Sequence, residues 1–275
     1  MELKFKVTKE MVLKDFLKEV GVSRTLGRKI KLYGKVYLND IEVKNHVLVR
    51  VGDVIKIYLP PTINANIKII NKPVDVLYED EIIIIVNKEA NLSIQPSSKH
   101  QDDNLVSRVL AYFFKNNIQA NCHILTRLDY PVSGIVIIAK NAYVHNMLSK
   151  TQISKEYLCK TSEPLPENSG NIHLPITRDF TSKIKRKVDI SGKEATTLYR
   201  LINEDDLGYT YLIKILTGRT HQIRVHLSHL GSPIIGDELY FGNKYPRLLL
   251  HSYRVKFVHP IKMEDIVIEC PSLDF

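Results

Sequence analysis

Residues 126–140 read TRLDYPVSGIVIIAK, a polar turn followed by an apolar run. The run, GIVIIAK, is too short to span a membrane and is rich in β-branched residues, so it predicts a buried strand. One carboxylate, Asp129, stands just before that strand, between an Arg-Leu pair and a Tyr-Pro pair. Such a residue is a turn-former, a surface charge or a reacting group, and only the chain around it separates these possibilities.

The segments on both sides of this strand predict an α+β fold. Strand patterns and helix patterns are both present, but the helices are too few for the regular β-α-β alternation of a doubly wound sheet. We expect a mixed, mostly antiparallel sheet flanked by helices and loops. The expected strands lie within residues 81–97, 134–140, 156–161 and 208–218, and the expected helices within residues 103–117, 142–152 and 220–231, the first capped by Asp103 and the last by Gly231.

Positive charge is concentrated near the N-terminus. The 275 residues carry a formal net charge of +9; residues 1–60 hold 13 Lys and Arg against 7 Asp and Glu, a balance of +6, and residues 61–275 hold 26 against 23, a balance of +3. Such a concentration is typical of a unit that binds a polyanion, most often nucleic acid. We expect an RNA-binding domain over residues 1–60, a linker over residues 61–75 that starts at the adjacent prolines Pro60 and Pro61, and a second domain over residues 76–275.

The N-terminal unit has the pattern of two short helices followed by short alternating strands. The second helix begins after Ser23, a favourable N-cap, and ends at Gly34. One of its sides is apolar and the other cationic. Cations at this spacing match a row of backbone phosphates, although a solvated helix face has the same pattern. The apolar row is Leu26, Ile30 and Tyr33, and the cationic row is Arg24, Arg28, Lys31 and Lys35.

This order of elements resembles the small RNA-binding domain with the alpha-L motif, which occurs in a ribosomal small-subunit protein, tyrosyl-tRNA synthetases and several RNA-modifying enzymes. Asp40 departs from the pattern, because that domain usually has Gly at this position. The departure affects a turn and leaves the cationic helix unchanged. The residues that carry the resemblance are Ser23, Arg24, Gly34, Val36, Asn39 and Val51 to Asp53.

Several classes of protein are disfavoured by the composition. Cys122, Cys159 and Cys270 are widely separated, which favours buried thiols over a disulfide framework or a Cys-x-x-Cys zinc site. The N-terminus is charged and lacks the apolar core of a signal peptide, and no apolar run is long enough to cross a bilayer. The glycine patterns that bind nucleotide phosphates are absent. We therefore expect a cytoplasmic protein without a nucleotide cofactor.

Three further groups of residues have open interpretations. The histidines of HQIRVHLSH, residues 221–229, do not share one helical face, which disfavours a metal site. The basic segment 182–193, SKIKRKVDISGK, is expected to be hairpin-like, and both RNA contact and a solvated loop explain it. The adjacent carboxylates Glu79 to Glu81 would suit a two-carboxylate glycosidase, but neighbours in an acidic turn more often face solvent.

Asp129 has two candidate cationic partners. Arg127 is two residues away and lies on the same side if the segment is extended. Arg224 stands at the border of the apolar face of the helix expected over residues 220–231. A carboxylate held by an arginine in a partly buried site stays ionised at neutral pH, and a structural salt bridge has the same signature as an active site. Residue chemistry alone favours the structural salt bridge.

The stretch TRLDYPVSGIVIIAK resembles the Arg-Leu-Asp motif of the RluA-type pseudouridine synthases, and residues 216–240, LTGRTHQIRVHLSHLGSPIIGDELY, resemble the second signature of that family nearly throughout. The matches occur in the family's order over residues 76–271, and an N-terminal domain of the alpha-L type is a common companion. The resemblance implies the pseudouridine synthase fold and an isomerase that converts uridines of RNA to pseudouridine with no cofactor or metal. Further matching residues are Val76 to Glu81, Asn87, Lys88, Lys155, Tyr157, Pro175, Arg178, Asp179 and Leu249 to His251.

The resemblance also implies roles for individual residues. Asp129 is the implied nucleophile, and Arg127 occupies the space of the flipped-out uridine. The ring of Tyr157 packs against the target base, Arg224 is the ionic partner of Asp129, and Leu250 belongs to the substrate pocket. Four residues depart from the family pattern, and the first two flank the catalytic loop, where they bear on its packing and on substrate preference: Thr126 (usually His), Val132 (usually Thr), Cys159 (Ala is common) and Glu89 (Pro is common).

These observations lead to the hypothesis of a cytoplasmic RNA pseudouridine synthase that modifies large-subunit ribosomal RNA, with transfer RNA as the second candidate substrate. No membrane and no obligate protein partner are implied. The alternative is a non-catalytic RNA-binding or ribosome-assembly factor that keeps the fold. The set Asp129, Tyr157 and Arg224 argues against it, because a pure binder has no need of a charged pocket.

Overall fold

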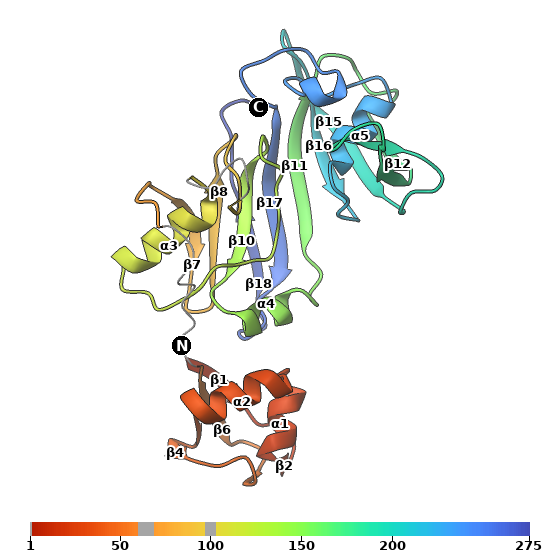
Figure 1. Cartoon of the computed structure of the whole chain (residues 1–275). Helices are drawn as coiled ribbons and strands as arrows, with labels where there is room; N and C mark the ends of the chain where they lie inside the picture. Colours follow the sequence, from red (N-terminus) through yellow and green to blue (C-terminus); the bar gives the residue numbers. More distant parts are fainter. Residues whose placement is uncertain (1, 60–68, 97–102) are drawn as a thin grey trace.

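A computed structural model describes residues 2–59, 69–96 and 103–275, and the chain has two parts (Figure 1). A small N-terminal part holds a four-stranded sheet and two helices, and a larger part is organised around a ten-stranded sheet. Most of the linker expected over residues 61–75 lies outside the described residues. The expected division into domains stays a prediction.

The N-terminal part packs two helices, α1 (Leu13–Glu19) and α2 (Arg24–Tyr33), against an antiparallel sheet with the strand order β1-β6-β3-β4. Helix α2 begins as expected, since the Ser23 hydroxyl accepts a hydrogen bond from the backbone N–H of Leu26 at 3.2 Å. The strands of this part are β1 (Glu2–Lys6), β2 (Met11–Val12), β3 (Lys35–Leu38), β4 (Ile41–Glu42), β5 (Leu48–Val49) and β6 (Val54–Tyr58).

The two rows expected on α2 are only partly correct. Ile30 is buried, but Tyr33 is 72% exposed, because the helix ends there and Gly34 leads the chain into β3. Lys35 lies on β3 rather than on the helix, and its ammonium is 3.3 Å from the Glu42 carboxylate. The cationic row on the helix therefore consists of three exposed residues, Arg24, Arg28 and Lys31.

The larger part confirms the mixed, mostly antiparallel sheet. Its strands run in the order β12-β15-β16-β11-β17-β10-β8-β7, with β9 paired to β10 and β18 paired to β17. Within the part of the chain that the structure describes, β10 and β17 run parallel and the other pairs of this sheet are antiparallel. The strands are β7 (Asp75–Glu79), β8 (Ile83–Lys88), β9 (His123–Ile124), β10 (Ser133–Ala139), β11 (Ser154–Thr161), β12 (Ser169–His173), β15 (Thr196–Asp205), β16 (Gly208–Ile215), β17 (Leu250–Val258) and β18 (Asp265–Glu269), and a separate hairpin pairs β13 (Ile176–Arg178) with β14 (Arg186–Val188).

Both faces of the central strands are covered, which explains their continuous apolar runs. Alternate residues of β8 and β10 point to opposite faces. One face packs with α4 (Ala142–Leu148) and the N-terminal part, and the other packs with α3 (Leu105–Lys115). The first set is Ile83, Ile85, Ile135 and Ile137, and the second is Ile84, Val86, Val136 and Ile138.

Two helix ends differ from the expectation by one residue. Asn104, not Asp103, caps α3, since its side chain accepts a hydrogen bond from the N–H of Ser107 at 3.0 Å. Asp103 instead accepts hydrogen bonds from the guanidinium of Arg108 at 2.7 and 2.9 Å. Helix α5 (Gln222–His229) has its C-cap at the residue before Gly231. Asn and Asp are equally good N-caps, so the adjacent pair made the start of α3 ambiguous.

The parallel pairing of β10 and β17 depends on Gly134. Its φ is 109°, and a Cβ at this position would stand 2.3 Å from the carbonyl oxygen of Ser252. The bare backbone allows a register in which Ser133 faces His251, with the Ser133 hydroxyl 2.8 Å from His251 Nδ1. The loop that precedes β10 is thereby placed beside the start of β17, at Leu250.

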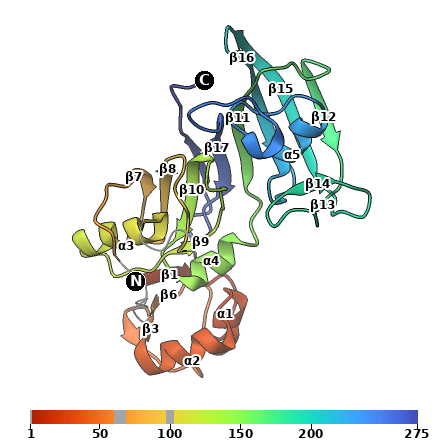
Figure 2. The ribbon, with the colours of Figure 1, turned by 45° about the horizontal axis from the view of Figure 1, so that its top comes forward.

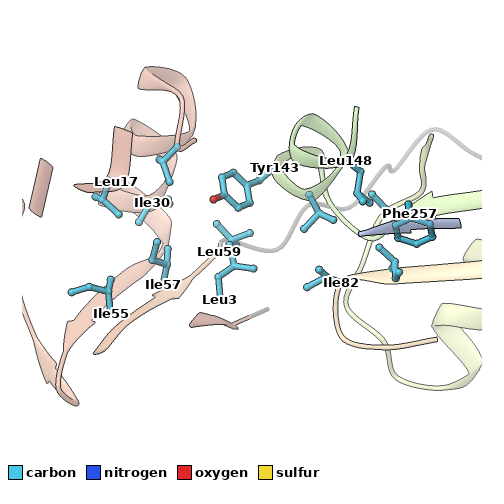
Figure 3. Packing of buried hydrophobic residues seen from close by; sticks show 14 of the residues in the cluster. Leu3, Leu17, Ile30, Ile55, Ile57, Leu59, Ile82, Tyr143, Leu148 and Phe257 are labelled. Carbon is cyan, nitrogen blue, oxygen red and sulfur yellow. The ribbon is translucent and has the colours of Figure 1, made fainter. Parts of the chain in front are cut away.

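One hydrophobic cluster joins the two parts of the molecule (Figure 3). Tyr143 of α4 is buried between the N-terminal part and the sheet, and its hydroxyl donates a hydrogen bond to the carbonyl oxygen of Val20. Leu3 and Leu59 from the N-terminal part and Ile82 from the larger part belong to the same cluster. The N-terminal part is therefore packed against the end of the sheet at α4, as both ribbon views show (Figure 1, Figure 2).

Replacing Tyr143 should weaken this junction. We expect Tyr143→Ala to lower the free energy of unfolding by about 3 kcal/mol, because buried aromatic-to-alanine changes leave a cavity. Tyr143→Phe should lower it by about 1 kcal/mol, the net value of one hydrogen bond. Urea denaturation measures both. Phe114→Ala, at a ring that is 77% exposed, is the control and should change it by less than about 0.5 kcal/mol. If Tyr143→Ala and Phe114→Ala lowered the free energy of unfolding equally, Tyr143 would not belong to a core shared by the two parts.

Candidate active site

The loop between β9 and β10 carries Asp129 and is fixed to the sheet. The N–H of Leu125 donates to the carbonyl of Ile137 at 2.9 Å, and the N–H of Ile137 donates to the Thr126 hydroxyl at 2.8 Å. A turn follows, in which the N–H of Val132 donates to the Asp129 carbonyl at 3.1 Å. Thr126 and Val132, the two departures that flank the loop, are both buried and contribute to its packing.

Lys88, the last residue of β8, holds this loop from the protein interior. Its side chain is fully buried, and its ammonium donates to the carbonyl oxygens of Glu89 and Leu92 at 2.9 Å each and of Tyr130 at 3.2 Å. Burial lowers the pKa of Lys88 to about 7, while the charges of Glu89 and Asp129 oppose the shift. Tyr130 follows Asp129 in the chain, so Lys88 fixes the backbone next to the carboxylate.

Arg224 of α5 lies between two carboxylates. Its Nε and Nη2 donate to the two carboxylate oxygens of Asp237 at 2.7 Å, and its Nη1 donates to Asp129 Oδ2 at 3.3 Å. Burial acts to lower the pKa of Arg224, but the hydrogen bonds and charge of Asp237, together with the charge of Asp129, raise it above its ordinary value. Arg224 therefore keeps its charge and orients Asp129, whose side chain is 29% exposed.

His221 is the other neighbour of Asp129. It precedes α5 in the left-handed conformation, with φ 57°, and its Nε2 is 3.6 Å from Asp129 Oδ2. Its Nδ1 is 2.8 Å from the Tyr240 hydroxyl, which accepts a hydrogen bond from the N–H of Arg186 at 2.8 Å. The Tyr240 hydroxyl thus holds the ring in an orientation that turns Nε2 toward the carboxylate. Burial lowers the pKa of His221, against the charge of Asp129, so the ring is neutral at pH 7.

Asp129 lies on the wall shared by two cavities. The first has a volume of about 320 Å³ and the second a volume of about 700 Å³. Tyr157 of β11 and Leu250 of β17 are buried and line the first cavity. Burial, followed by the charge of Asp129, raises the pKa of Tyr157, so its hydroxyl keeps its hydrogen. The residues common to both cavities are Arg127, Leu128, Asp129, Thr220, His221 and Arg224.

The structure brings the predicted pocket residues together and leaves the predicted RNA-binding residues elsewhere. Of the two candidate partners of Asp129, Arg224 pairs with it, whereas Arg127 is exposed and lines both cavities. The N-terminal part, with its cationic residues, lies at the other end of the molecule from α5 (Figure 1), and residues of α5 line both cavities. The pocket residues are Asp129, Arg127, Tyr157, Arg224 and Leu250, and the distant ones are Arg24, Arg28, Lys31 and Lys35.

Four residues that shape the site were not predicted. All four stand within stretches that match the family, so the resemblance could have pointed to them as site residues. Their roles depend on the conformation of two turns, which no helical or strand period reveals. The four are Lys88, His221, Asp237 and Tyr240.

Over residues 2–59, 69–96 and 103–275, no three His, Cys, Asp or Glu side chains gather in a way that could hold a metal ion. No helix within the same residues is long and apolar enough to cross a membrane.

Known proteins resemble this chain over the region that contains most of the cavity-lining residues. A family model described as RNA pseudouridylate synthase matches residues 82–229. The chain is also 31% identical over 269 residues to a protein of Bacillus subtilis (strain 168) named uncharacterized RNA pseudouridine synthase YjbO, and the match covers 95% of each chain. The chain belongs to the RNA pseudouridine synthase family.

As a member of this family the protein is an isomerase that acts on RNA. It is 32% identical over 283 residues to the ribosomal large subunit pseudouridine synthase D of Xylella fastidiosa (strain Temecula1 / ATCC 700964), covering 95% of this chain and 84% of that relative. The solved structure of human RNA pseudouridylate synthase domain containing 1 shares the fold, with a TM-score of 0.62 at 22% identity over 74% of this chain and 85% of that one. These matches confirm the predicted fold, family and reaction, and they favour the enzyme over the non-catalytic alternative.

Removing the buried carboxylate behind Arg224 should damage both stability and activity of this RNA pseudouridine synthase. We expect Asp237→Asn to lower the free energy of unfolding by about 3 kcal/mol, because the change leaves a buried guanidinium without its main counter-charge. The isomerisation rate should fall as well, since Arg224 no longer holds Asp129 in place. Urea denaturation and a single-turnover assay measure the two effects.

The control for this change is Asp274→Asn. Asp274 is the exposed partner of Arg247, so its loss should cost less than about 1 kcal/mol and leave the rate unchanged. If the two variants behaved alike, Asp237 would have no special part in holding Arg224.

Proposed function

We propose that this RNA pseudouridine synthase uses Asp129 as its nucleophile on a uridine of large-subunit ribosomal RNA. One observation carries the assignment: Arg224 holds Asp129 Oδ2 on the wall of a cavity that Tyr157 and Leu250 also line. The Asp129 side chain is 29% exposed, whereas that of Asp237, the second carboxylate on Arg224, is buried. Asp129 is therefore the carboxylate that a substrate can reach.

The reaction exchanges one bond of the nucleoside for another. The bond from C1′ to N1 of the base breaks, the base rotates, and a bond from C1′ to C5 forms. C5 loses its proton and N1 gains one, so substrate and product are isomers and no oxidant or energy source is required. Asp129 attacks the base or C1′ and is released when the new bond forms. The Arg224 guanidinium stabilises the carboxylate as it leaves.

Tyr157 and Leu250 supply the surface on which the released base stays while it rotates. Both are buried and both line the first cavity beside Asp129. Packing of a base against an aromatic ring is worth about 1–3 kcal/mol and tolerates rotation of the base, because it depends on the ring faces rather than on fixed hydrogen bonds. The Tyr157 hydroxyl, kept protonated by its raised pKa, adds no second negative charge to the pocket.

Arg127 is suited to replace the uridine in the RNA. Extrusion of a base costs a few kcal/mol, and an intruding side chain offsets part of that cost. Arg127 is exposed and forms no ion pair with any residue that the structure describes, so its side chain is available to enter the RNA. Its position in the lining of both cavities supports this role.

The cationic row of α2 is suited to bind phosphates of the same RNA. Arg24, Arg28 and Lys31 are exposed, and none of them has an ion-pair partner in the described part of the chain. The hydrophobic cluster around Tyr143 fixes their position relative to Asp129. Ribosomal RNA as substrate is supported by the name of the Xylella fastidiosa relative, and transfer RNA is the second candidate.

Asp129→Asn should abolish the reaction. We expect tritium release from ribosomal RNA labelled at uridine C5 to slow by about 10⁴-fold or more, since loss of a nucleophile leaves only binding and positioning effects. Asp265→Asn, at an exposed carboxylate paired with Lys256, is the control and should keep the full rate. Parallel assays with transfer RNA show which RNA is the substrate. Undiminished release by Asp129→Asn would refute the assignment.

The triple variant Arg24→Gln, Arg28→Gln and Lys31→Gln should bind RNA more weakly and with less dependence on salt. Each lost phosphate contact should reduce the slope of log K against log salt concentration by about 0.7–0.9. Filter binding over a range of KCl concentrations measures the slope. The matched control removes three exposed lysines of the same part, Lys9, Lys14 and Lys18, and should leave the slope nearly unchanged. Equal slopes for both triple variants would show that α2 only contributes net charge.

A further inference from the structure

The second cavity leads from Asp129 to elements that the reaction on uracil does not use. Its volume, about 700 Å³, is roughly twice that of the first cavity, and its lining includes Ile184 of the β13–β14 hairpin and Leu239 of the turn after α5. Figure 2 shows this hairpin beside α5. Hairpin and turn are connected, because the N–H of Arg186 donates to the Tyr240 hydroxyl at 2.8 Å.

Large apolar side chains gather on the same hairpin and turn. Phe180, Ile184 and Phe241 are 87%, 58% and 80% exposed. Single exposed apolar residues are ordinary, but these three adjoin the second cavity. Ile184 lines it, Phe180 lies in the same loop as Ile184, and Phe241 lies in the same turn as Leu239, which also lines it. The Lys185 ammonium lies 4.8 Å from the centre of the Phe241 ring, so the two loops face each other.

The backbone holds Phe241 in solvent. Its φ is 69°, in the left-handed region that a bulky residue adopts only when its surroundings impose it. The N–H of Gly242 donates to the Asp237 carbonyl at 2.9 Å, and a Cβ at Gly242 would stand 2.0 Å from the carbonyl oxygen of Ile234. The tight turn that carries the buried Asp237 therefore sets the exposed position of the Phe241 ring.

The charges around these rings favour RNA over a protein partner. Lys183 and Lys185 form no ion pair with the described residues, while the nearby Asp179 accepts hydrogen bonds from Thr181 and Asp189 is paired with Lys187 at 2.8 Å. Protein interfaces are depleted in lysine at their core, whereas exposed rings beside unpaired cations are the usual means of binding single-stranded nucleic acid.

We propose that Phe180, Ile184, Lys185 and Phe241 form a nucleotide-stacking surface that binds unpaired nucleotides next to the target uridine. The inference rests on the proposed function, which places that uridine at Asp129. A base stacks on the Phe241 ring, and the Lys185 ammonium moves from the ring to a neighbouring phosphate. The preferred substrate is then a uridine in a loop with unpaired neighbours, not one within a continuous duplex.

The test compares single-stranded and duplex RNA in the Asp129→Asn background, so that no turnover occurs during binding. The probes are a labelled oligouridylate of about nine nucleotides, within the usual site size for single strands, and the same strand annealed to oligoadenylate. Phe180→Ala is combined with Phe241→Asn, because Asn tolerates the left-handed backbone. We expect the Kd for the single strand to rise about 10-fold and the Kd for the duplex to change less than about twofold, as loss of stacking on one or two bases requires.

Two variants control for folding and for general loss of apolar surface. Phe241→Tyr keeps a stacking ring and should restore single-strand binding when it replaces Phe241→Asn. Phe114→Ala removes a similarly exposed ring on α3 and should have no effect. An unchanged Kd for the single strand, an equal loss for the duplex, or an equal loss in Phe114→Ala would overturn the stacking surface.

Activity separates this inference from the proposed nucleophile. With Asp129 intact, the Phe180→Ala and Phe241→Asn changes should raise KM for ribosomal RNA about 10-fold and leave kcat within about twofold, because stacking contributes to binding and not to bond exchange. A fall in kcat with unchanged KM would overturn the inference. If Asp129→Asn proved active, the nucleophile assignment would fail, while the binding comparison would still decide the stacking surface.

Discussion

The charge of Arg224 is the constraint on which the arrangement of the site depends. A guanidinium removed from water costs several kcal/mol unless its donors are satisfied and its charge is balanced. Asp237, 13 residues later, takes two of its donors, and Asp129, 95 residues earlier, takes a third. The loop after β9, helix α5 and the turn after α5 therefore have to converge when the chain folds. Lys88 also fixes this loop from the protein interior, since its ammonium donates a hydrogen bond to the backbone carbonyl of Tyr130, next to Asp129.

The two carboxylates bind Arg224 unequally. Asp237 holds the guanidinium in place, and Asp129 is left open to a substrate. Asp237 is bound at 2.7 Å through both oxygens and is buried, so a substrate cannot reach it. Asp129 is bound through one oxygen at 3.3 Å and is partly exposed, which leaves it able to form a bond. Tyr240 serves both sides of this arrangement. Its ring centre lies 5.0 Å from the guanidinium carbon of Arg224, and its hydroxyl orients His221 toward Asp129.

Short-range features of the fold were predictable from the sequence, and features set by turns or distant contacts were not. The Ser23 cap and the apolar run of β10 depend on neighbouring residues, and both were predicted. Strand β17 was not, because it buries polar side chains such as His251 and therefore lacks an apolar run. Lys35 was misplaced because the helical spacing was continued past Gly34, the residue at which the helix was itself expected to end and does end. In the site, Asp129 was identified through the family motif. The role of Asp237 could not be predicted, because it depends on the turn after α5 that brings Asp237 back to Arg224.

Two hydrogen bonds and one close contact join the proposed stacking surface to the loop that carries Asp129, which has a consequence for how RNA would be positioned. The backbone N–H of Arg186 in β14 donates to the Tyr240 hydroxyl, that hydroxyl is hydrogen-bonded to Nδ1 of His221, and the other ring nitrogen is 3.6 Å from Asp129. A shift of the hairpin would disturb the hydrogen bond that orients the His221 ring. The hairpin is thus not an independent flap but is linked to the carboxylate through the His221 ring. A nucleotide held on it would lie at a fixed distance from Asp129, which is the condition for accepting one uridine of a loop and rejecting its neighbours.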